Sequence, residues 1–99
     1  MRQIKELVEE IKEELDGAEN YAIKFVEAKA REDALETERL REMTLDELKH
    51  ASWIHNKAVQ EIQKISQTYT PPPEMIEKWK HEHKEYVERA AHIRQMLEL

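Results

Sequence analysis

Two glutamates and one histidine have the types and spacing of a metal site. Glu47 and His50 form a Glu-x-x-His pair, and Glu14 lies well upstream of them. On a helix, residues at the Glu-x-x-His spacing lie on the same side, so both side chains can reach one ion. Carboxylate and imidazole donors together suit iron, manganese or zinc. The pattern therefore predicts a metal site of Glu14, Glu47 and His50, provided that helices hold these residues face to face.

The first predicted helix, about residues 3–28, places Glu14 inside an apolar stripe. At about 100° per residue, the stripe comprises Ile4, Leu7, Val8, Ile11, Leu15, Ala18, Tyr21, Ala22, Phe25 and Val26. Glu6, Glu9, Glu10, Glu13 and Glu27 fall outside it. A carboxylate within such a stripe must be protonated, paired or bound to metal, because an unpaired buried charge is costly. The alternative to a metal is a pair with a lysine or with Tyr21.

The second predicted helix, about residues 34–68, carries the Glu-x-x-His pair. Asp33 followed by Glu36 has the spacing of a capping box, which marks the helix start. Its apolar side comprises Leu40, Met43, Leu48, Ala51, Ile54, Ala58, Val59, Ile62, Ile65 and Tyr69. Glu47 falls within this arc and His50 on its edge, whereas His55 points more centrally and is expected to be a hydrogen-bonded core residue. A start at Thr44 is an alternative that would make Glu47 a cap.

The third predicted helix, about residues 73–98, follows the run Pro71, Pro72 and Pro73, which must end the second helix. Pro73 can occupy the first turn of this helix. The residues expected to face inward are Met75, Ile76, Trp79, Tyr86, Val87, Ala90, Ile93 and Leu97. Glu82 and His83 are further candidate metal ligands, or partners that orient one. The alternative is a buried His83 hydrogen-bonded to Tyr86 or to a carboxylate.

Composition and length predict an all-α protein of one domain over residues 1–99, and the short connections predict an antiparallel bundle of three long helices. The chain has one glycine, 39% apolar residues and 38% charged residues. Its net charge of −6 argues against a nucleic-acid partner, which requires clustered basic residues. Without cysteine, a metal can be held only by carboxylate and imidazole. No apolar run approaches the roughly 18 residues of a membrane span, and the chain opens on amphipathic helix, so a cytoplasmic protein is expected.

Two segments, Glu14–Tyr21 (ELDGAENY) and Glu47–Ala51 (ELKHA), resemble the ferritin-like superfamily, in particular rubrerythrin-type domains and short encapsulated ferritins. The resemblance implies an iron cofactor, with Glu14, Glu47 and His50 as ligands and catalytic residues. It also implies a homodimer or higher homo-oligomer in which two chains complete a four-helix-type bundle and a di-iron site. The implied activity is a ferroxidase that oxidises Fe(II) for storage or detoxification. An encapsulin shell or a phage particle is a further candidate partner.

The chain also departs from that family. It has a single Glu-x-x-His, where full ferritin-like bundles have two, and no obvious C-terminal peptide for an encapsulin shell. A mononuclear site of Glu14, Glu47, His50 and His83 is therefore open as well. So is a function from another class: a helical structural or interaction protein, such as a phage or bacterial assembly factor, with a ferritin-like fold and a degenerate site.

Overall fold

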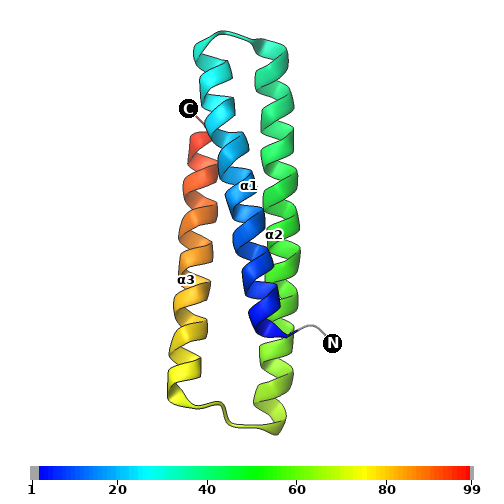
Figure 1. Ribbon diagram of the computed structural model, residues 1–99, viewed down its shortest axis with the longest axis vertical. Helices are drawn as coiled ribbons and strands as arrows, with labels where there is room; N and C mark the ends of the chain where they lie inside the picture. Colours follow the sequence, from blue (N-terminus) through cyan, green and yellow to red (C-terminus); the bar gives the residue numbers. More distant parts are fainter. Residues whose placement is uncertain (1–2, 99) are drawn as a thin grey trace.

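The computed structural model describes residues 3–98, which form three long helices joined by two short connections (Figure 1). Helix α1 spans Ile4–Ala30, α2 spans Ala34–Thr68 and α3 spans Pro73–Met96, and the described residues contain no strand. The helices run antiparallel in sequence order along a rod of 54 × 23 × 15 Å. The predicted all-α, three-helix antiparallel arrangement is confirmed, with each helix boundary within two residues of its predicted position.

The α1–α2 hairpin turns just before Asp33, the helix cap predicted from the sequence. The Asp33 side chain accepts a hydrogen bond from the Glu36 backbone N–H at 3.1 Å, which satisfies one of the free donors at the start of α2. Glu32 just before it takes a left-handed φ of 60°. The alternative start at Thr44 is wrong. Thr44 is fully buried within α2, and its hydroxyl donates to the Leu40 carbonyl oxygen at 2.7 Å.

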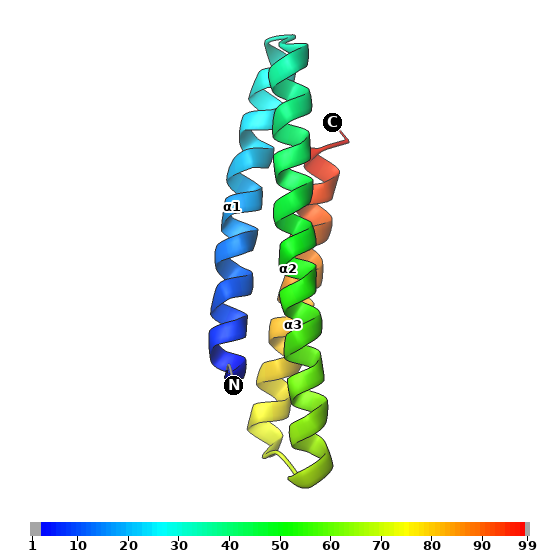
Figure 2. The same ribbon diagram turned by 90° about the vertical axis from the view of Figure 1, so that its right-hand side faces the viewer.

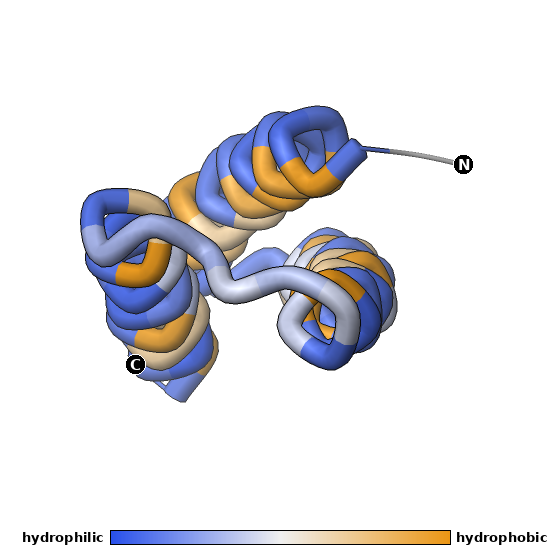
Figure 3. The backbone as a smooth tube through the Cα atoms, turned by 90° about the horizontal axis from the view of Figure 1, so that it is seen from below, coloured by the Kyte–Doolittle hydropathy of each residue, from blue (hydrophilic) through white to orange (hydrophobic). Residues whose placement is uncertain are grey.

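The core lies mainly between α1 and α2, and the buried residues of α2 end at Ala58, ten residues before the helix does. Large side chains fill it, with Leu7, Leu15 and Ile54 at most 2% exposed. Between them lie alanines that let the two backbones approach closely: Ala18, Ala22, Ala28, Ala51 and Ala58. Seen along the long axis, apolar positions of the helices turn towards the space between them (Figure 3). This tight hairpin fixes the relative height of any two residues on α1 and α2.

Helix α3 lies along the hairpin (Figure 2). Its buried residues fall in its second half. Pro73 occupies its first turn as predicted, and Ala90 and Ile93 are its buried residues. Met75, Ile76 and Val87, predicted to face inward, are instead 36–47% exposed. The physical reason is geometric: a helix with neighbours on one side only buries a narrower stripe than a helix inside a four-helix bundle.

Several polar contacts attach α3 to the hairpin, among them those of Arg89 and Arg41. The Arg89 guanidinium contacts Asp16 at 2.8 Å and Glu19 at 2.9 Å, both on α1. Near the end of α3, the Arg41 guanidinium of α2 donates to the Leu97 carbonyl oxygen at 3.0 Å. Across residues 3–98, no helix combines the length and the apolar composition that a membrane span requires.

Candidate metal centre

Glu14 of α1 and His50 of α2 meet across the hairpin. Glu14 Oε1 lies 3.0 Å from His50 Nδ1, and the two side chains are 20% and 48% exposed. The antiparallel register of α1 and α2 sets these residues at the same height along the rod. Two of the three residues selected from the sequence are therefore in direct contact, in a half-buried position that solvent can reach.

Glu47 joins the same cluster from one turn earlier on α2. Its side chain is hydrogen-bonded to Glu14, and this raises the pKa of Glu47 to about 7, with burial and the negative charge of Glu14 adding to the effect. His50 acts in the opposite direction, since positive charge nearby favours the carboxylate. Near neutral pH, Glu47 therefore retains a proton that a free glutamate has lost, and in this protonated form it can donate to Glu14.

Gly17, the single glycine of the chain, lies beneath the Glu47 carboxyl group. A Cβ atom built at Gly17 would lie 3.6 Å from Glu47 Oε2, an ordinary van der Waals contact. The Glu47 carboxyl group therefore lies over Gly17 at the distance of a normal contact. A methyl group would fit this space, whereas a larger side chain would compete with the Glu47 carboxyl group.

Glu10 is a fourth member that the sequence analysis missed. Single ligand atoms from Glu10, Glu14 and His50 all lie within 4.8 Å of one another. Glu10 falls outside the apolar stripe of α1, so the stripe alone does not point to it. The signal that could have found it is its spacing of one helical turn from Glu14, which puts both carboxylates on one side of α1.

Trp53 lies beside His50 on the exposed side of the cluster. The two rings stack loosely, with centroids 6.1 Å apart and planes at 22°. The Lys57 ammonium lies 3.9 Å from the centre of the Trp53 ring, a cation–π contact. Trp53 is nevertheless 53% exposed. A large apolar side chain therefore remains open to solvent directly next to the candidate ligands.

The cluster lies on the side of the hairpin that α3 leaves open. Helix α3 contacts α1 through Lys12, Asp16 and Glu19. At about 100° per residue, Asp16 projects roughly 160° away from Glu14, on the opposite flank of α1. No described helix therefore covers the face that carries Glu14, Glu47 and His50.

Glu82 and His83 lie on the α3 side, away from this cluster. Glu82 forms an ion pair with Lys12 at 3.3 Å. His83 is exposed rather than facing the core, because the first half of α3 lies at the surface, and its Nδ1 lies 3.0 Å from His55 Nε2. His55 is half-buried and hydrogen-bonded, as expected. Tyr86, considered as a hydrogen-bond partner of His83, instead stacks on His55.

The donor set on the hairpin fits a divalent cation. Ligand atoms of Glu10, Glu14 and His50 lie within 4.8 Å of one another, and Glu47 adjoins this group through Glu14. Oxygen-rich sites with one nitrogen suit iron and manganese, with zinc also compatible. A cation would also relieve the repulsion between Glu14 and Glu47 that a proton relieves now. Comparison of the chain with protein-family models, curated proteins and solved structures returned no match.

Proposed function

We propose that this chain is a ferritin-like metal-binding protein that takes up Fe(II) at Glu14, Glu47 and His50, with Glu10 beside them. The observation that carries the proposal is the contact of Glu14 with His50 on one solvent-reachable face, with a Glu10 oxygen within 4.8 Å of both and Glu47 adjoining Glu14. The nearby negative charge of Glu14 disfavours the charged form of Glu47. A bound cation would offset the repulsion between these carboxylates.

Each residue has a definite part in uptake. Glu47 must release its proton before both carboxylates can bind a cation, so binding is coupled to proton release near pH 7. His50 must turn Nδ1 from Glu14 to the ion, and the half-exposed position of its ring permits this. Glu10, whose ligand atom lies within 4.8 Å of those of Glu14 and His50, offers a further carboxylate oxygen to the ion. Bound iron would supply the redox step, in which Fe(II) is oxidised and O₂ or peroxide is reduced.

A second copy of the chain completes the proposed centre. One chain supplies a single Glu-x-x-His, whereas di-iron carboxylate bundles use two such units. The open face that carries Glu14 and Trp53 is the place where a second hairpin would bring its own glutamates and histidine. The proposed assembly is thus a homodimer whose two hairpins form a four-helix bundle around the metal.

Anaerobic titration of metal-stripped protein with Fe(II), followed by addition of O₂, tests the proposal. We expect saturation at about one iron per chain and a near-ultraviolet ferric band after O₂ is added. Glu47→Ala and His50→Ala should each lose both signals. Glu61→Ala on α2 and His92→Ala on α3 are matched controls that remove the same residue types far from the cluster, and they should retain both.

One observation favours a second function, a structural or interaction protein without a metal. In the described structure, the cluster satisfies its own polar groups: Glu14 pairs with His50, Glu47 bonds to Glu14, and no buried side-chain nitrogen or oxygen lacks a partner. In that case Fe(II) would not saturate, and Glu47→Ala would be at least as stable as the parent protein. Manganese and zinc titrations under the same conditions separate a different native metal from the absence of any.

A further inference from the structure

A pair of histidines on the opposite side of the molecule is not used by the proposed iron centre. His55 Nε2 of α2 and His83 Nδ1 of α3 lie 3.0 Å apart, with ring centroids at 5.1 Å. His55 follows His50 on the same helix but projects about 140° away from it. The pair thus joins α2 to α3, whereas the carboxylate cluster joins α1 to α2.

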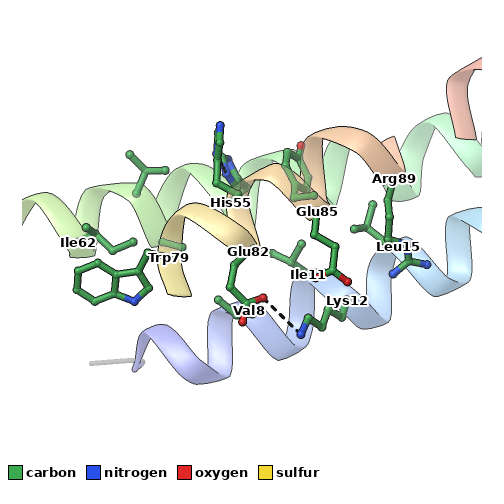
Figure 4. Close-up of a pocket in the computed structure, with 14 residues that line it drawn as sticks. Val8, Ile11, Lys12, Leu15, His55, Ile62, Trp79, Glu82, Glu85 and Arg89 are labelled. Carbon is green, nitrogen blue, oxygen red and sulfur yellow. Dashed lines mark hydrogen bonds and ion pairs between the residues drawn. The ribbon is translucent and has the colours of Figure 1, made fainter. Parts of the chain in front are cut away.

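The surroundings hold one ring of the pair and leave the other free to turn. Tyr86 stacks on His55 with centroids 4.3 Å apart and planes at 10°, which fixes the His55 ring. His83 is exposed to solvent. Beneath the pair lies a cavity of about 50 Å³ between the three helices, with an apolar lining that includes Val8 and Ile11 and with the Lys12–Glu82 ion pair at its edge (Figure 4).

A hydrogen bond between two imidazoles requires one N–H donor and one nitrogen lone pair. A metal ion can take the place of that proton and bind both nitrogens. Zn–N bonds of about 2.0–2.1 Å in a tetrahedral site separate two ligand nitrogens by about 3.3 Å. The pair therefore needs to open by only about 0.3 Å, together with a rotation of the exposed His83 ring.

We propose that His55 and His83 form a two-histidine site for a borderline divalent cation, Zn²⁺, Ni²⁺ or Cu²⁺, that clamps α3 to α2. Imidazole favours these ions, in contrast to the oxygen-rich centre on the hairpin. Water fills the remaining coordination positions, since His83 faces solvent. Burial, together with the nearby His83, lowers the pKa of His55, which keeps its ring in the neutral form that binds metal.

The clamp acts where α3 is held least firmly. The buried residues of α3, Ala90 and Ile93, both lie in its second half, while His83 belongs to the first half. A metal bridge at His83 therefore adds a strong contact to a segment whose apolar residues Met75 and Ile76 are partly exposed. Because only the folded protein holds both rings together, the ion must raise the melting temperature.

Calorimetric titration with Zn²⁺ at about pH 7.5, together with thermal melts, tests this proposal. His83→Gln should weaken one class of Zn²⁺ sites by about tenfold or more and remove part of the Zn²⁺-dependent rise in melting temperature. His92→Gln removes another exposed histidine of α3 and should change neither. Glu47→Ala combined with His50→Ala should leave the His83-dependent class intact, which separates this site from the iron centre.

Equal Zn²⁺ affinity and equal stabilisation in His83→Gln and the parent protein would overturn the proposal. NMR gives a second readout that does not depend on a variant. The imidazole proton signals of His55 and His83 should shift together on addition of Zn²⁺, at lower concentration than those of His81 and His92. If all four histidines shift in parallel, the ion binds surface histidines in general and the clamp does not exist.

Discussion

At the scale of single residues, the surroundings of Glu47 disfavour a negatively charged carboxylate. Glu47 lies within an apolar arc, it contacts a second carboxyl group, and it has Gly17 beneath it. These surroundings raise the pKa of Glu47 to about 7. Between about pH 4.5 and pH 7, the folded protein therefore holds a proton that a free glutamate has lost. The group nevertheless remains compatible with the fold because the proton turns a repulsive pair into a hydrogen bond.

The raised pKa predicts a pH-dependent stability that Glu47→Gln removes. Between about pH 4.5 and pH 7 the folded chain binds this proton and the unfolded chain does not, so the contribution of Glu47 is present at low pH and is lost as pH rises. Glutamine keeps a hydrogen-bond donor and carries no charge. We therefore expect Glu47→Gln to melt at a higher temperature than the parent above about pH 7, with little difference near pH 4.

Thermal melts of both proteins across this range provide the measurement. His55, whose pKa is lowered, contributes with the opposite sign, and this contribution is common to both proteins and cancels in the difference. Glu61→Gln is the matched control, because Glu61 pairs with Lys64 on the same helix. A difference between Glu47→Gln and the parent that does not change with pH would show that Glu47 does not hold the proton.

At the scale of helices, the α1–α2 hairpin positions the candidate centre. Gly17 lies in the interior of α1, next to Glu47 of α2. Glycine weakens a helix by about 1 kcal/mol relative to alanine. The space above Gly17 is occupied by the Glu47 carboxyl group, and an added Cβ atom would meet it at 3.6 Å without a clash. The contact with Glu47 therefore does not require a glycine at position 17.

We expect Gly17→Ala to stabilise the protein by about 0.5–1 kcal/mol, a rise of several degrees in melting temperature. The variant should retain metal binding because the carboxyl group of Glu47 stays in place. Gly17→Leu should instead displace Glu47 and weaken binding, even where the helix itself is more stable. A thermal melt and an Fe(II) titration of each variant test this, and destabilisation by alanine would mean that α1 and α2 approach more closely than described.

At the scale of the whole molecule, three helices leave one face of the hairpin uncovered, and that face carries both the candidate ligands and an exposed tryptophan. Trp53 is 53% exposed next to His50. Exposed tryptophans beside a polar centre are typical of the anchors of protein interfaces. On the opposite face, α3 covers the hairpin and the His55–His83 pair bridges α2 and α3.

The proposed dimer predicts that Trp53→Arg disrupts assembly. Burial of the tryptophan between two hairpins favours association, whereas a buried, unpaired arginine opposes it. In sedimentation velocity we expect the parent to be dimeric with Fe(II), and Trp53→Arg to be monomeric with lower iron affinity. Tyr69→Arg at the far end of α2, where the tyrosine is similarly exposed, is the control and should remain dimeric. A parent that stays monomeric with saturating Fe(II) would exclude the shared di-iron centre.

The helices themselves could be predicted from the sequence because their causes are local. Helix starts and ends depend on residues within one turn, such as Asp33 at the cap and Pro73 in the first turn of α3. The apolar stripes likewise depend only on the helical period. The contact of Glu14 with the Glu-x-x-His pair followed from two such stripes packing in antiparallel order.

The tertiary structure alone decided which flank of each helix faces which neighbour. Glu10 joins Glu14 and His50, although its position lies outside the apolar stripe of α1. Glu82 and His83 lie away from the centre because α3 packs on the opposite flank of α1. The physical reason is that periodicity fixes angles within one helix, whereas the rotation of one helix against another depends on the packing of all side chains between them.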